Sequence, residues 1–196
     1  MPNHAHPRIL ATVVIIRDAP FYKSGSRICK AAVLVTEPVG KIEARFTLRE
    51  QCFAPAMGEG QIMVRIAAMI PKWSDLLMRV PTRTPEYNAL LAKGAPHLPD
   101  DDIQRLVKAM PRETGKLWLL HLTDEQMADE AAQIGFTIPH WETDWQHHCL
   151  YADIEVQALW TAFVDAFCTE AHALHLLAAR QAWQALEQAA ARIVER

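Results

Sequence analysis

The sequence predicts an α/β or α+β fold, with a mixed sheet that begins as an antiparallel meander of three or four strands. Three observations support this fold class. Residues 1–70 contain short apolar and alternating runs typical of strands, residues 116–135 follow the pattern strand, turn, helix, and residues 153–196 repeat apolar residues at helical spacing. A chain of 196 residues is long enough for one buried core, so we expect a single domain spanning residues 1–196.

Three strands are predicted in the first seventy residues. Residues 8–17 and 28–36 contain short runs of β-branched and other apolar residues, as buried strands do. In residues 41–49 apolar and polar residues alternate, so one face of this strand packs on the core and the other faces water. The link Glu37–Gly40 predicts that the second and third strands form a hairpin. Residues 61–70 fit either a fourth strand or a buried helix.

Residues 71–196 are predicted to be mainly helical, with one or two strands near 116–122 and 138–146. From Asp153 onward, apolar residues keep helical spacing almost to the end of the chain. This stretch is too long for one typical helix. We therefore expect a break near Thr169, which is a suitable N-cap.

Capping residues mark the starts of three helices in this part of the chain. Thr84 is placed to cap a helix that Gly94 ends, and another helix begins at Pro99. Asp100–Asp102 follow that proline, and we interpret this acid triplet as capping and dipole stabilisation rather than as a metal site. The Thr123–Gln126 pair has the spacing of a capping box and predicts a helix after the 116–122 strand.

Charge is distributed unevenly along the chain. Residues 1–50 carry eight Lys/Arg and four Asp/Glu, a net +4, whereas residues 116–196 carry four and twelve, a net −8. The total of −3 therefore combines a basic N-terminal part with an acidic C-terminal part. This asymmetry predicts a polyanion or an acidic protein as the partner of the basic part, and a basic partner or solvent for the acidic part.

Composition and motifs exclude several classes of protein. No apolar stretch approaches the roughly 20 residues of a membrane helix, and the N-terminus lacks the layout of a secretory signal, so we expect a cytoplasmic protein without membrane contact. The four cysteines form no Cys-x-x-Cys pair and are interpreted as reduced thiols. Neither a Gly-x-Gly-x-x-Gly motif nor a P-loop occurs, so no cofactor is expected.

Basic residues gather in the part of the chain that is predicted to form the first strands. Three of them share one face of the third strand, and three more come from the adjoining loop and strand. The predicted contacts to phosphate, and to bases through two aromatic side chains, are Lys23, Arg27, Lys30, Lys41, Arg45, Arg49, Phe21 and Tyr22. The alternative is a solvated outer strand whose charges prevent association of sheet edges.

The densest group of possible metal ligands lies in residues 140–149. The candidates are imidazole, carboxylate and thiolate groups: His140, Asp144, His147 and Cys149, with Asp124 or His175 from elsewhere in the chain. His147 and His148 would point to opposite faces of a strand, so they cannot both join one tetrahedral site. We interpret the segment as a surface loop and expect no bound metal, and a metal-dependent phosphodiesterase is the alternative.

Segments of the sequence are similar to one nuclease family. They are the predicted strands and a late helix: residues 13–16, 26–33, 40–46, 115–121 and 175–183. These segments resemble the ribonuclease H-like fold of the proofreading-type, four-carboxylate 3′-to-5′ exonucleases. The resemblance implies a mixed sheet with closing helices, and a site in which acidic residues hold two metal ions.

The acidic residues of that family are absent at the corresponding positions. Arg17 and Ala19 stand at the first Asp-x-Glu motif. Gln126 falls near the second-motif aspartate, and Arg180 stands at the last aspartate. An arginine reverses the charge of a metal ligand and repels the cation. The resemblance therefore implies an inactive copy of the family.

These patterns together predict a non-catalytic binding or adaptor subunit of a cytoplasmic nucleic-acid-handling assembly. Its basic N-terminal sheet would contact phosphate or an acidic partner, and its partners would be a protein of the assembly together with RNA or DNA. The absence of a complete catalytic motif argues against an enzyme. Two alternatives stay open, a metal-dependent exonuclease-like enzyme and an acidic inhibitor or immunity-type factor that binds a protein.

Overall fold

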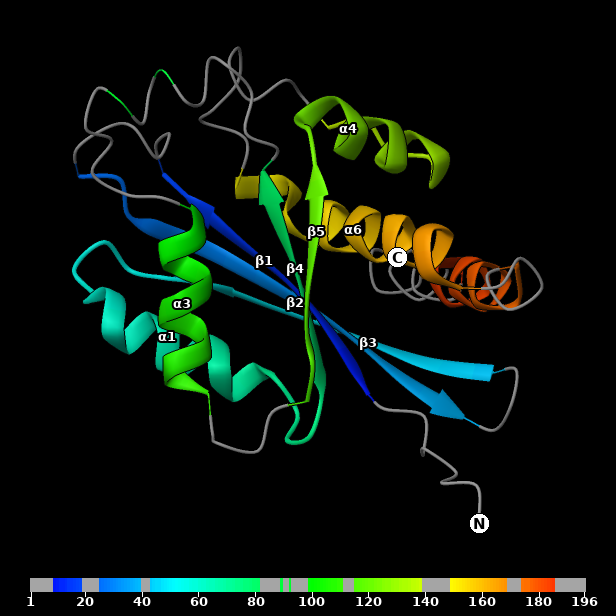
Figure 1. The fold of residues 1–196 in the computed structure, drawn as a ribbon, viewed down its shortest axis with the longest axis horizontal. Coiled ribbons are helices and arrows are strands. Elements are labelled where there is room, and N and C mark those ends of the chain that lie inside the picture. The colour runs from blue at the N-terminus through cyan, green and yellow to red at the C-terminus, as the bar shows by residue number, and fades with distance from the viewer. Residues whose placement is uncertain are drawn as a thin grey trace, which may run out of the picture.

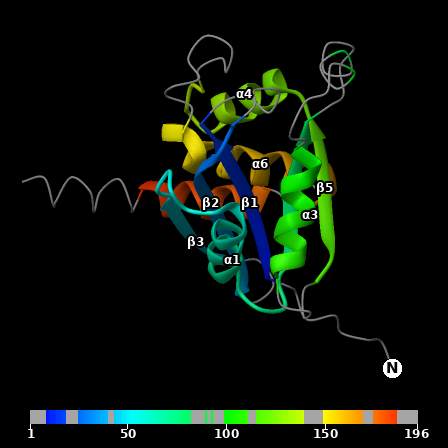
Figure 2. The same ribbon diagram turned by 90° about the vertical axis from the view of Figure 1, so that its left-hand side faces the viewer.

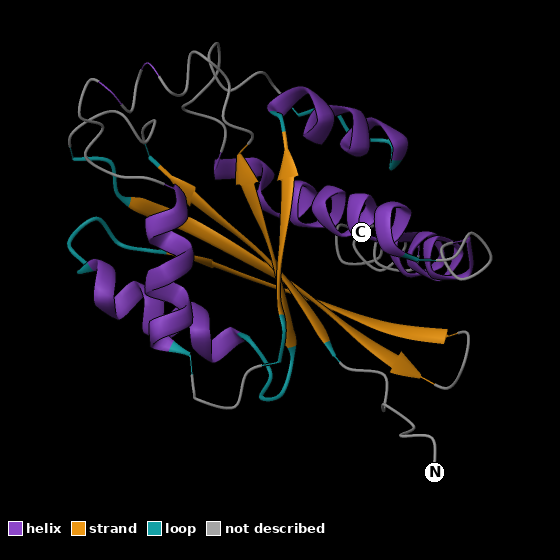
Figure 3. Ribbon diagram, in the orientation of Figure 1, coloured by secondary structure: helices purple, strands orange, loops and turns teal. Residues whose placement is uncertain are grey.

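The structure is a computed structural model with one five-stranded mixed sheet and helices on both of its faces (Figures 1 and 3). It describes residues 9–18, 25–39, 43–81, 89, 92, 99–110, 115–138, 149–168 and 174–185. The α/β class and the N-terminal antiparallel meander predicted from the sequence are confirmed. Within the described ranges, no helix has the length and apolar character needed to cross a membrane.

The five strands lie in the order β3-β2-β1-β4-β5. They are β1 (Leu10–Arg17), β2 (Ile28–Val39), β3 (Glu43–Cys52), β4 (Asp75–Pro81) and β5 (Leu117–Leu122). β1, β2 and β3 are antiparallel neighbours, whereas β4 pairs in parallel with β1 and with β5. The central strand β1 therefore has an antiparallel partner on one side and a parallel partner on the other.

The hairpin of β2 and β3 is confirmed, but β2 continues further along the chain than expected. Glu37 pairs with Arg45, and Val39 pairs with Glu43. Glu37 and Val39 therefore belong to the strand β2 and not to the link between the strands. Pro38 lies inside the ladder, opposite Ala44. A proline removes only one donor from a ladder, and the alternating residues of β3 extend the pairing beyond it.

β4 was not predicted, because residues 71–115 were expected to be helical. The strand Asp75–Pro81 is buried from both sides of the sheet, and Leu76, Leu77 and Met78 are at most 4% exposed. A strand that is buried on both faces shows no apolar-polar alternation. Its short apolar run therefore reads equally well as part of a helix.

Helices cover both faces of the sheet (Figures 1 and 2). α1 (Glu59–Met69) and α3 (Pro99–Ala109) pack on one face, which we call the α1 face. α4 (Asp124–Gln133), α6 (Ala152–Phe167) and the helical residues 174–185 pack on the other, the α6 face. The segment that fitted either a strand or a helix is α1, so the meander has three strands.

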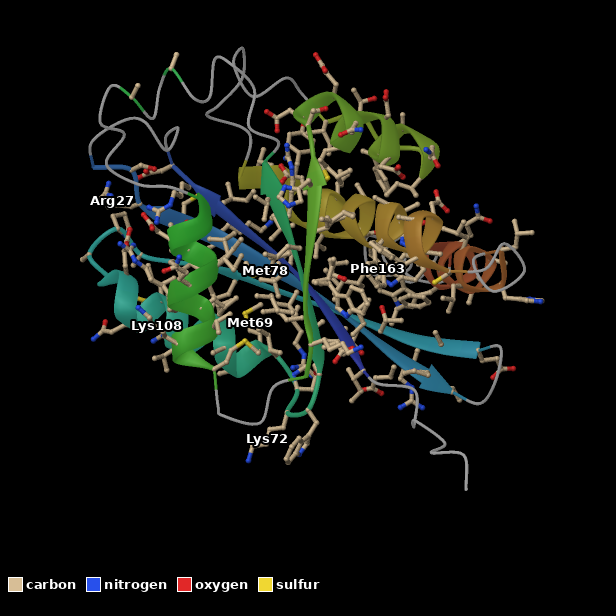
Figure 4. The ribbon with its side chains drawn as sticks, in the orientation of Figure 1. Arg27, Met69, Lys72, Met78, Lys108 and Phe163 are labelled. Atoms are coloured by element: carbon tan, nitrogen blue, oxygen red, sulfur yellow. The ribbon has the colours of Figure 1, made fainter. Side chains whose placement is uncertain are left out.

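Each face has its own apolar core, because side chains alternate along the strands. Ala11 and Val13 of β1 belong to the core on the α1 face, and Val14 and Ile16 belong to the core on the α6 face. Figure 4 shows Met78 and Phe163, which pack into these two cores from different elements.

The large aromatic residues gather on the α6 face. Trp160 of α6 is 1% exposed and contacts Phe46 of β3 edge to face, with ring centroids 5.1 Å apart. Trp118 of β5 meets Phe163 in the same way at 5.5 Å. α6 is therefore fastened to strands at both edges of the sheet.

The predicted ends of the later helices are confirmed. Thr123 and Gln126 form a capping box at the start of α4, and Gly135, with φ 85°, follows its last turn. α6 ends at Phe167, next to the predicted break near Thr169. The helix expected from Thr84 to Gly94 falls almost entirely outside the described residues, and so does the strand expected near residues 138–146.

The start of β5 is held against β4 at Gly115. Its backbone N–H donates to the carbonyl oxygen of Ser74 at 2.8 Å, and the next N–H, of Lys116, donates to Asp75 Oδ1 at 2.7 Å. A Cβ atom at Gly115 would lie 2.1 Å from Asp75 Oδ1 and 2.9 Å from the Ser74 carbonyl oxygen. No side chain fits there unless the two strands move apart.

Gly115→Ala is therefore expected to lower the free energy of unfolding by about 1–3 kcal/mol, because overpacking forces the backbone to shift. Urea denaturation followed by circular dichroism measures the change. Gly60→Ala in α1 is the matched control, since nothing lies within 4 Å of its added Cβ. The control should be neutral or stabilising by up to about 1 kcal/mol. Equal effects of the two substitutions would contradict the close approach at Gly115.

Candidate functional site

The candidate site is a cluster of ion pairs at the carboxyl ends of the parallel strands β1, β4 and β5. In open α/β sheets, ligands bind outside these ends, at the point where the strand order reverses. Here the chain runs from β1 to β2 and β3 on one side and returns to β4 on the other, so the reversal lies between β1 and β4. Arg17 is the last residue of β1 and occupies this point.

Arg17 is buried and bonded on every side of its guanidinium. Nε donates to Asp102 Oδ2 at 2.8 Å, and Nη2 donates to Asp102 Oδ1 at 2.5 Å, which makes a two-pronged bond to one carboxylate of α3. Nη1 donates to Glu59 Oε1 of α1 at 2.9 Å and to the carbonyl oxygen of Ser26 at 2.8 Å. Arg105 of α3 bonds the other oxygen of Glu59.

The local chain places each member of this cluster. The β1–β2 ladder is irregular between Ile16 and Arg17, and such an irregularity redirects the side chain that follows. Glu59 is the first residue of α1, and Asp102 lies in the first turn and a half of α3. The positive ends of both helix dipoles favour carboxylates at these positions.

The electrostatics of the cluster follow from burial and pairing. Burial alone would lower the pKa of Arg17, but its hydrogen bonds and charge interactions with Asp102 and Glu59 outweigh burial and raise that pKa above its ordinary value. Two carboxylates meet two guanidinium groups here, so the cluster is neutral overall. Neither carboxylate is left without a cation.

A second ion pair lies at the same end of the sheet, on the α6 face. Arg79 of β4 donates from Nε to the carbonyl oxygen of Leu122 at 3.0 Å and from Nη2 to Asp124, the first residue of α4. The pair joins the ends of β4 and β5 to the helix that follows. Like Arg17, Arg79 is a cation that the protein itself has already neutralised.

The basic residues predicted to bind phosphate divide between the two faces of the sheet. Arg45 and Arg49 share one face of β3 as expected, and both are exposed. Arg45 lies 4.0 Å from Glu37, and Arg49 donates to the carbonyl oxygen of Met69 at the end of α1. Lys41, Lys23, Phe21 and Tyr22 lie outside the described residues.

Lys30 and Arg27 do not join that pair. Lys30 lies on the α6 face, where it pairs with Glu50 at 2.8 Å. Burial would lower the pKa of Lys30, but Glu50 outweighs burial and raises it, while burial and Glu50 together raise the pKa of Asp153 nearby. Arg27 pairs with Asp18 at 3.3 Å, and Figure 4 shows it at the upper left of the molecule, with Lys72 at the bottom. The expectation of one continuous basic stripe is therefore corrected for Lys30.

The metal ligands considered from the sequence are mostly beyond what the structure describes. His140, Asp144, His147 and the side chain of Cys149 fall outside the described residues. Asp124 is bonded to Arg79, and His175 lies exposed on the helical residues 174–185. Among the described residues, no group of three or more His, Cys, Asp and Glu side chains is arranged to hold a metal ion. Cys29, Cys52 and Cys168 form no disulfide bond with any described residue.

The positions that the nuclease resemblance singles out do not form a metal-binding set. Gln126 is occupied in the capping box of α4. Arg180, on the helical residues 174–185, packs on the α6 face, whereas Arg17 points to α1 and α3 on the opposite face. These three side chains therefore do not converge, and two of them are cations. The residues at these positions do not fit a pair of metal ions.

Arg180 is buried, and no carboxylate among the described residues bonds to it. The residue is 1% exposed, and its Nη1 donates to Gln184 Oε1 at 2.9 Å, while Gln184 Nε2 donates to Gln157 Oε1 at 2.7 Å. Its Nε and Nη2 have no hydrogen-bond partner within the described part of the chain. Burial lowers the pKa of Arg180 to about 10, because desolvation disfavours the cation.

The acidic C-terminal part of the sequence gathers where α4 meets α6. Asp124, Glu125 and Asp129 of α4 are exposed, and so is Asp165 of α6. Burial, followed by the charges of Asp165 and Asp129, raises the pKa of Glu130. Burial is the larger cause of this shift, and the two charges add to it because both aspartates lie near Glu130.

Sequence reasoning singled out Arg17 but missed its partners. Asp102 was assigned to helix capping, and Glu59, Arg105 and Arg79 were not singled out. Arg17 and Asp102 are 85 residues apart, and no local pattern connects residues at that distance. The only sequence signal was a run of acids at the start of a helix, which has an adequate local explanation.

Comparisons with protein-family models, curated proteins and solved structures found no match to this chain. The functional conclusion therefore depends on the geometry described above.

Proposed function

We propose that the protein is a non-catalytic binding or adaptor subunit of a nucleic-acid-handling assembly, with a ribonuclease H-like topology. The sheet order 3-2-1-4-5, with β4 and β5 parallel to β1, is compatible with that topology. The observation that carries the proposal is Arg17. A metal-dependent nuclease of this kind needs free carboxylates near the end of its central strand, and here a buried guanidinium occupies that place and neutralises both nearby acids.

The contact surface that the geometry favours is the outer strand β3. Arg45 and Arg49 project from the same face of this strand, and the side chain of Arg45 is 70% exposed. Their nearest recorded partners are a carboxylate 4.0 Å away and a backbone carbonyl, so both guanidinium groups keep donors for phosphate. The absence of a disulfide bond among the described cysteines supports a reducing compartment, and we infer a cytoplasmic location.

A polarisation titration with labelled single-stranded and double-stranded oligonucleotides tests this surface. Binding is expected at low salt, with an affinity that falls as salt rises. The double variant Arg45→Glu, Arg49→Glu should reduce the slope of log K against log salt by roughly one to two, because each phosphate contact releases about one counterion. Added magnesium or manganese should leave the oligonucleotide intact.

The control reverses two exposed charges away from β3, Lys108→Glu on α3 and Lys116→Glu directly before β5, the strand at the opposite edge of the sheet. This variant should retain most of the affinity of the parent. An absence of binding at low salt, or an equal loss in both double variants, would remove nucleic acid from the proposal. Metal-dependent hydrolysis would contradict the non-catalytic assignment itself.

A second candidate function is supported by the charge between α4 and α6. The exposed acids there, with the raised pKa of Glu130, suit a protein that binds a basic partner, as an inhibitor or immunity factor does. This function would be favoured over the first if the protein co-purified with one basic protein and did not bind oligonucleotides. The double variant Asp129→Lys, Asp165→Lys should then lose the basic partner.

A further inference from the structure

The two edges of the sheet differ in how they are protected. β3 forms one edge and carries four charged residues, Glu43, Arg45, Arg49 and Glu50, which discourage pairing with another strand. β5 forms the other edge, and its sequence from Leu117 to Leu122 has no charge, no proline and no glycine. Its only strand partner among the described residues is β4. An unprotected edge of this kind is a template for another strand.

The side chains beside this edge are apolar and exposed on the α1 face. Leu117 and Leu119 are each 43% exposed, and they pair in register with Leu76 and Met78 of β4. The neighbouring helix adds Val107, which is 41% exposed. We call Val107, Leu117 and Leu119 the β5 strip.

Val107 belongs to this strip because of the way α3 is turned. Arg105 lies on the flank of α3 that reaches Glu59 of α1. Two residues further on, the helix has rotated by about 200°, so Val107 lies on the opposite flank. α3 packs over β4, which places that flank on the side of β5, and Figure 2 shows α3 beside β5. Figure 1 shows no described element in front of β5.

We propose that the β5 edge pairs with the β5 edge of a second copy of this chain, in antiparallel orientation about a two-fold axis normal to the sheet. Such an axis keeps the two α1 faces on the same side, so the two β5 strips meet across it. The product is a closed dimer with a continuous ten-stranded sheet. Its two free edges would both be the charged strand β3, which explains why only one edge of the monomer is protected.

Charge complementarity favours a second copy of this chain over another partner, and it also favours one register of the two β5 strands. In an antiparallel pair about this axis, opposite residues lie on the same face, so the axis passes through Leu119 or through Leu120. With the axis at Leu120, exposed Lys116 lies opposite Asp124 of the partner at both ends of the strand. Asp124 is a half-exposed carboxylate, so it has room for a second cation besides Arg79. An unrelated peptide has no such matched charges at its two ends.

Analytical ultracentrifugation of the full chain over a range of concentrations tests the proposal. The parent should sediment as a dimer at micromolar concentration. Leu119→Lys should raise the dimer dissociation constant at least about 100-fold, because it places two charges in the apolar junction. Val64→Lys is the matched control, since Val64 of α1 is an exposed valine outside the strip, and it should leave the dimer intact. Equal thermal midpoints of the two variants show that both are folded.

Cysteine cross-linking tests the register. With the axis at Leu120, Leu119 lies opposite His121 of the partner, so the double variant Leu119→Cys, His121→Cys should form a covalent dimer on mild oxidation, and Leu119→Cys alone should not. A monomer at all concentrations, an open-ended polymer, or a dimer unaffected by Leu119→Lys would overturn the proposal. Cross-linking by Leu119→Cys alone would overturn the register.

Discussion

Replacing Arg17 by methionine is expected to lower the free energy of unfolding by about 3–5 kcal/mol. The substitution leaves Asp102 without the cation that bonds both of its oxygens, and the side chain of Asp102 is only 11% exposed. It also removes one of the two cations of Glu59. Leaving a buried carboxylate without a partner lowers the free energy of unfolding by far more than the ion pair itself contributes to stability.

Urea denaturation at neutral pH, followed by far-ultraviolet circular dichroism, measures this loss. Arg27→Met is the matched control, because Arg27 also pairs with an aspartate near this end of the sheet but is more than half exposed. Arg27→Met should lower the free energy of unfolding by no more than about 1 kcal/mol. The double variant Arg17→Met, Asp102→Leu should recover part of the stability, since it removes the stranded carboxylate. Similar losses for Arg17→Met and Arg27→Met would show that the buried cluster does not hold the helices to β1.

Replacing Arg180 by methionine is expected to have the opposite effect, a gain of about 1–4 kcal/mol. Arg180 is only 1% exposed, yet two of its donor nitrogens have no partner within the described ranges. Its one side-chain bond goes to a neutral amide, Gln184. Methionine keeps most of the packing volume and removes the cost of a desolvated charge.

The same denaturation experiment measures the gain, with Arg65→Met as the control at an exposed position of α1. The control should change stability by no more than about 0.5 kcal/mol. The gain should be constant from pH 6 to pH 8. The pKa of Arg180 in the folded protein is lowered to about 10, so the folded and unfolded chains both carry the cation in that range, and stability would rise with pH only above it. A loss of stability in Arg180→Met would mean that an anion does neutralise this guanidinium.

Most of the fold was predictable because most of its elements have a local signature. The strands β1, β2 and β3 show β-branched runs or strict alternation, and α4 carries a capping box and a terminal glycine. These signals act over a few residues, so the sequence alone contains them. β4 has neither signature, because helices cover both of its faces. Its burial is a property of the whole fold, which a seven-residue run does not contain.

The candidate site was less predictable because its bonds join distant parts of the chain. Residue type identified Arg17 as a cation at a place where a nuclease needs an acid. The partners come from two helices, and only the assembled fold brings Glu59 and Asp102 to the end of β1. The interpretation of Asp102 as a capping residue used only its place near the start of a helix, and it did not indicate the bonds to Arg17.

Strand periodicity predicted which basic residues share a face of the sheet only when they belong to the same strand. Arg45 and Arg49 share a face because they are separated by an even number of residues in β3. Lys30 belongs to β2 and pairs in register with Cys52, which is three residues from Arg49 and therefore on the other face of the sheet; the sequence alone does not give this register. The placement of its side chain on the α6 face needed the structure.

The parallel pairing of β1 with β4 has a consequence for how the chain folds. The contacts of β1, β2 and β3 are nearly sequential, so their loops close early and at small entropic cost. β4 and the carboxylate of Asp102 reach β1 only after α1 and the following residues have been made, across the 85-residue separation of the Arg17 pair. If β1, β2 and β3 form first, the Arg17 guanidinium at the end of β1 has no carboxylate partner at that stage. It pairs with Glu59 and Asp102 only when α1, β4 and α3 pack against these strands.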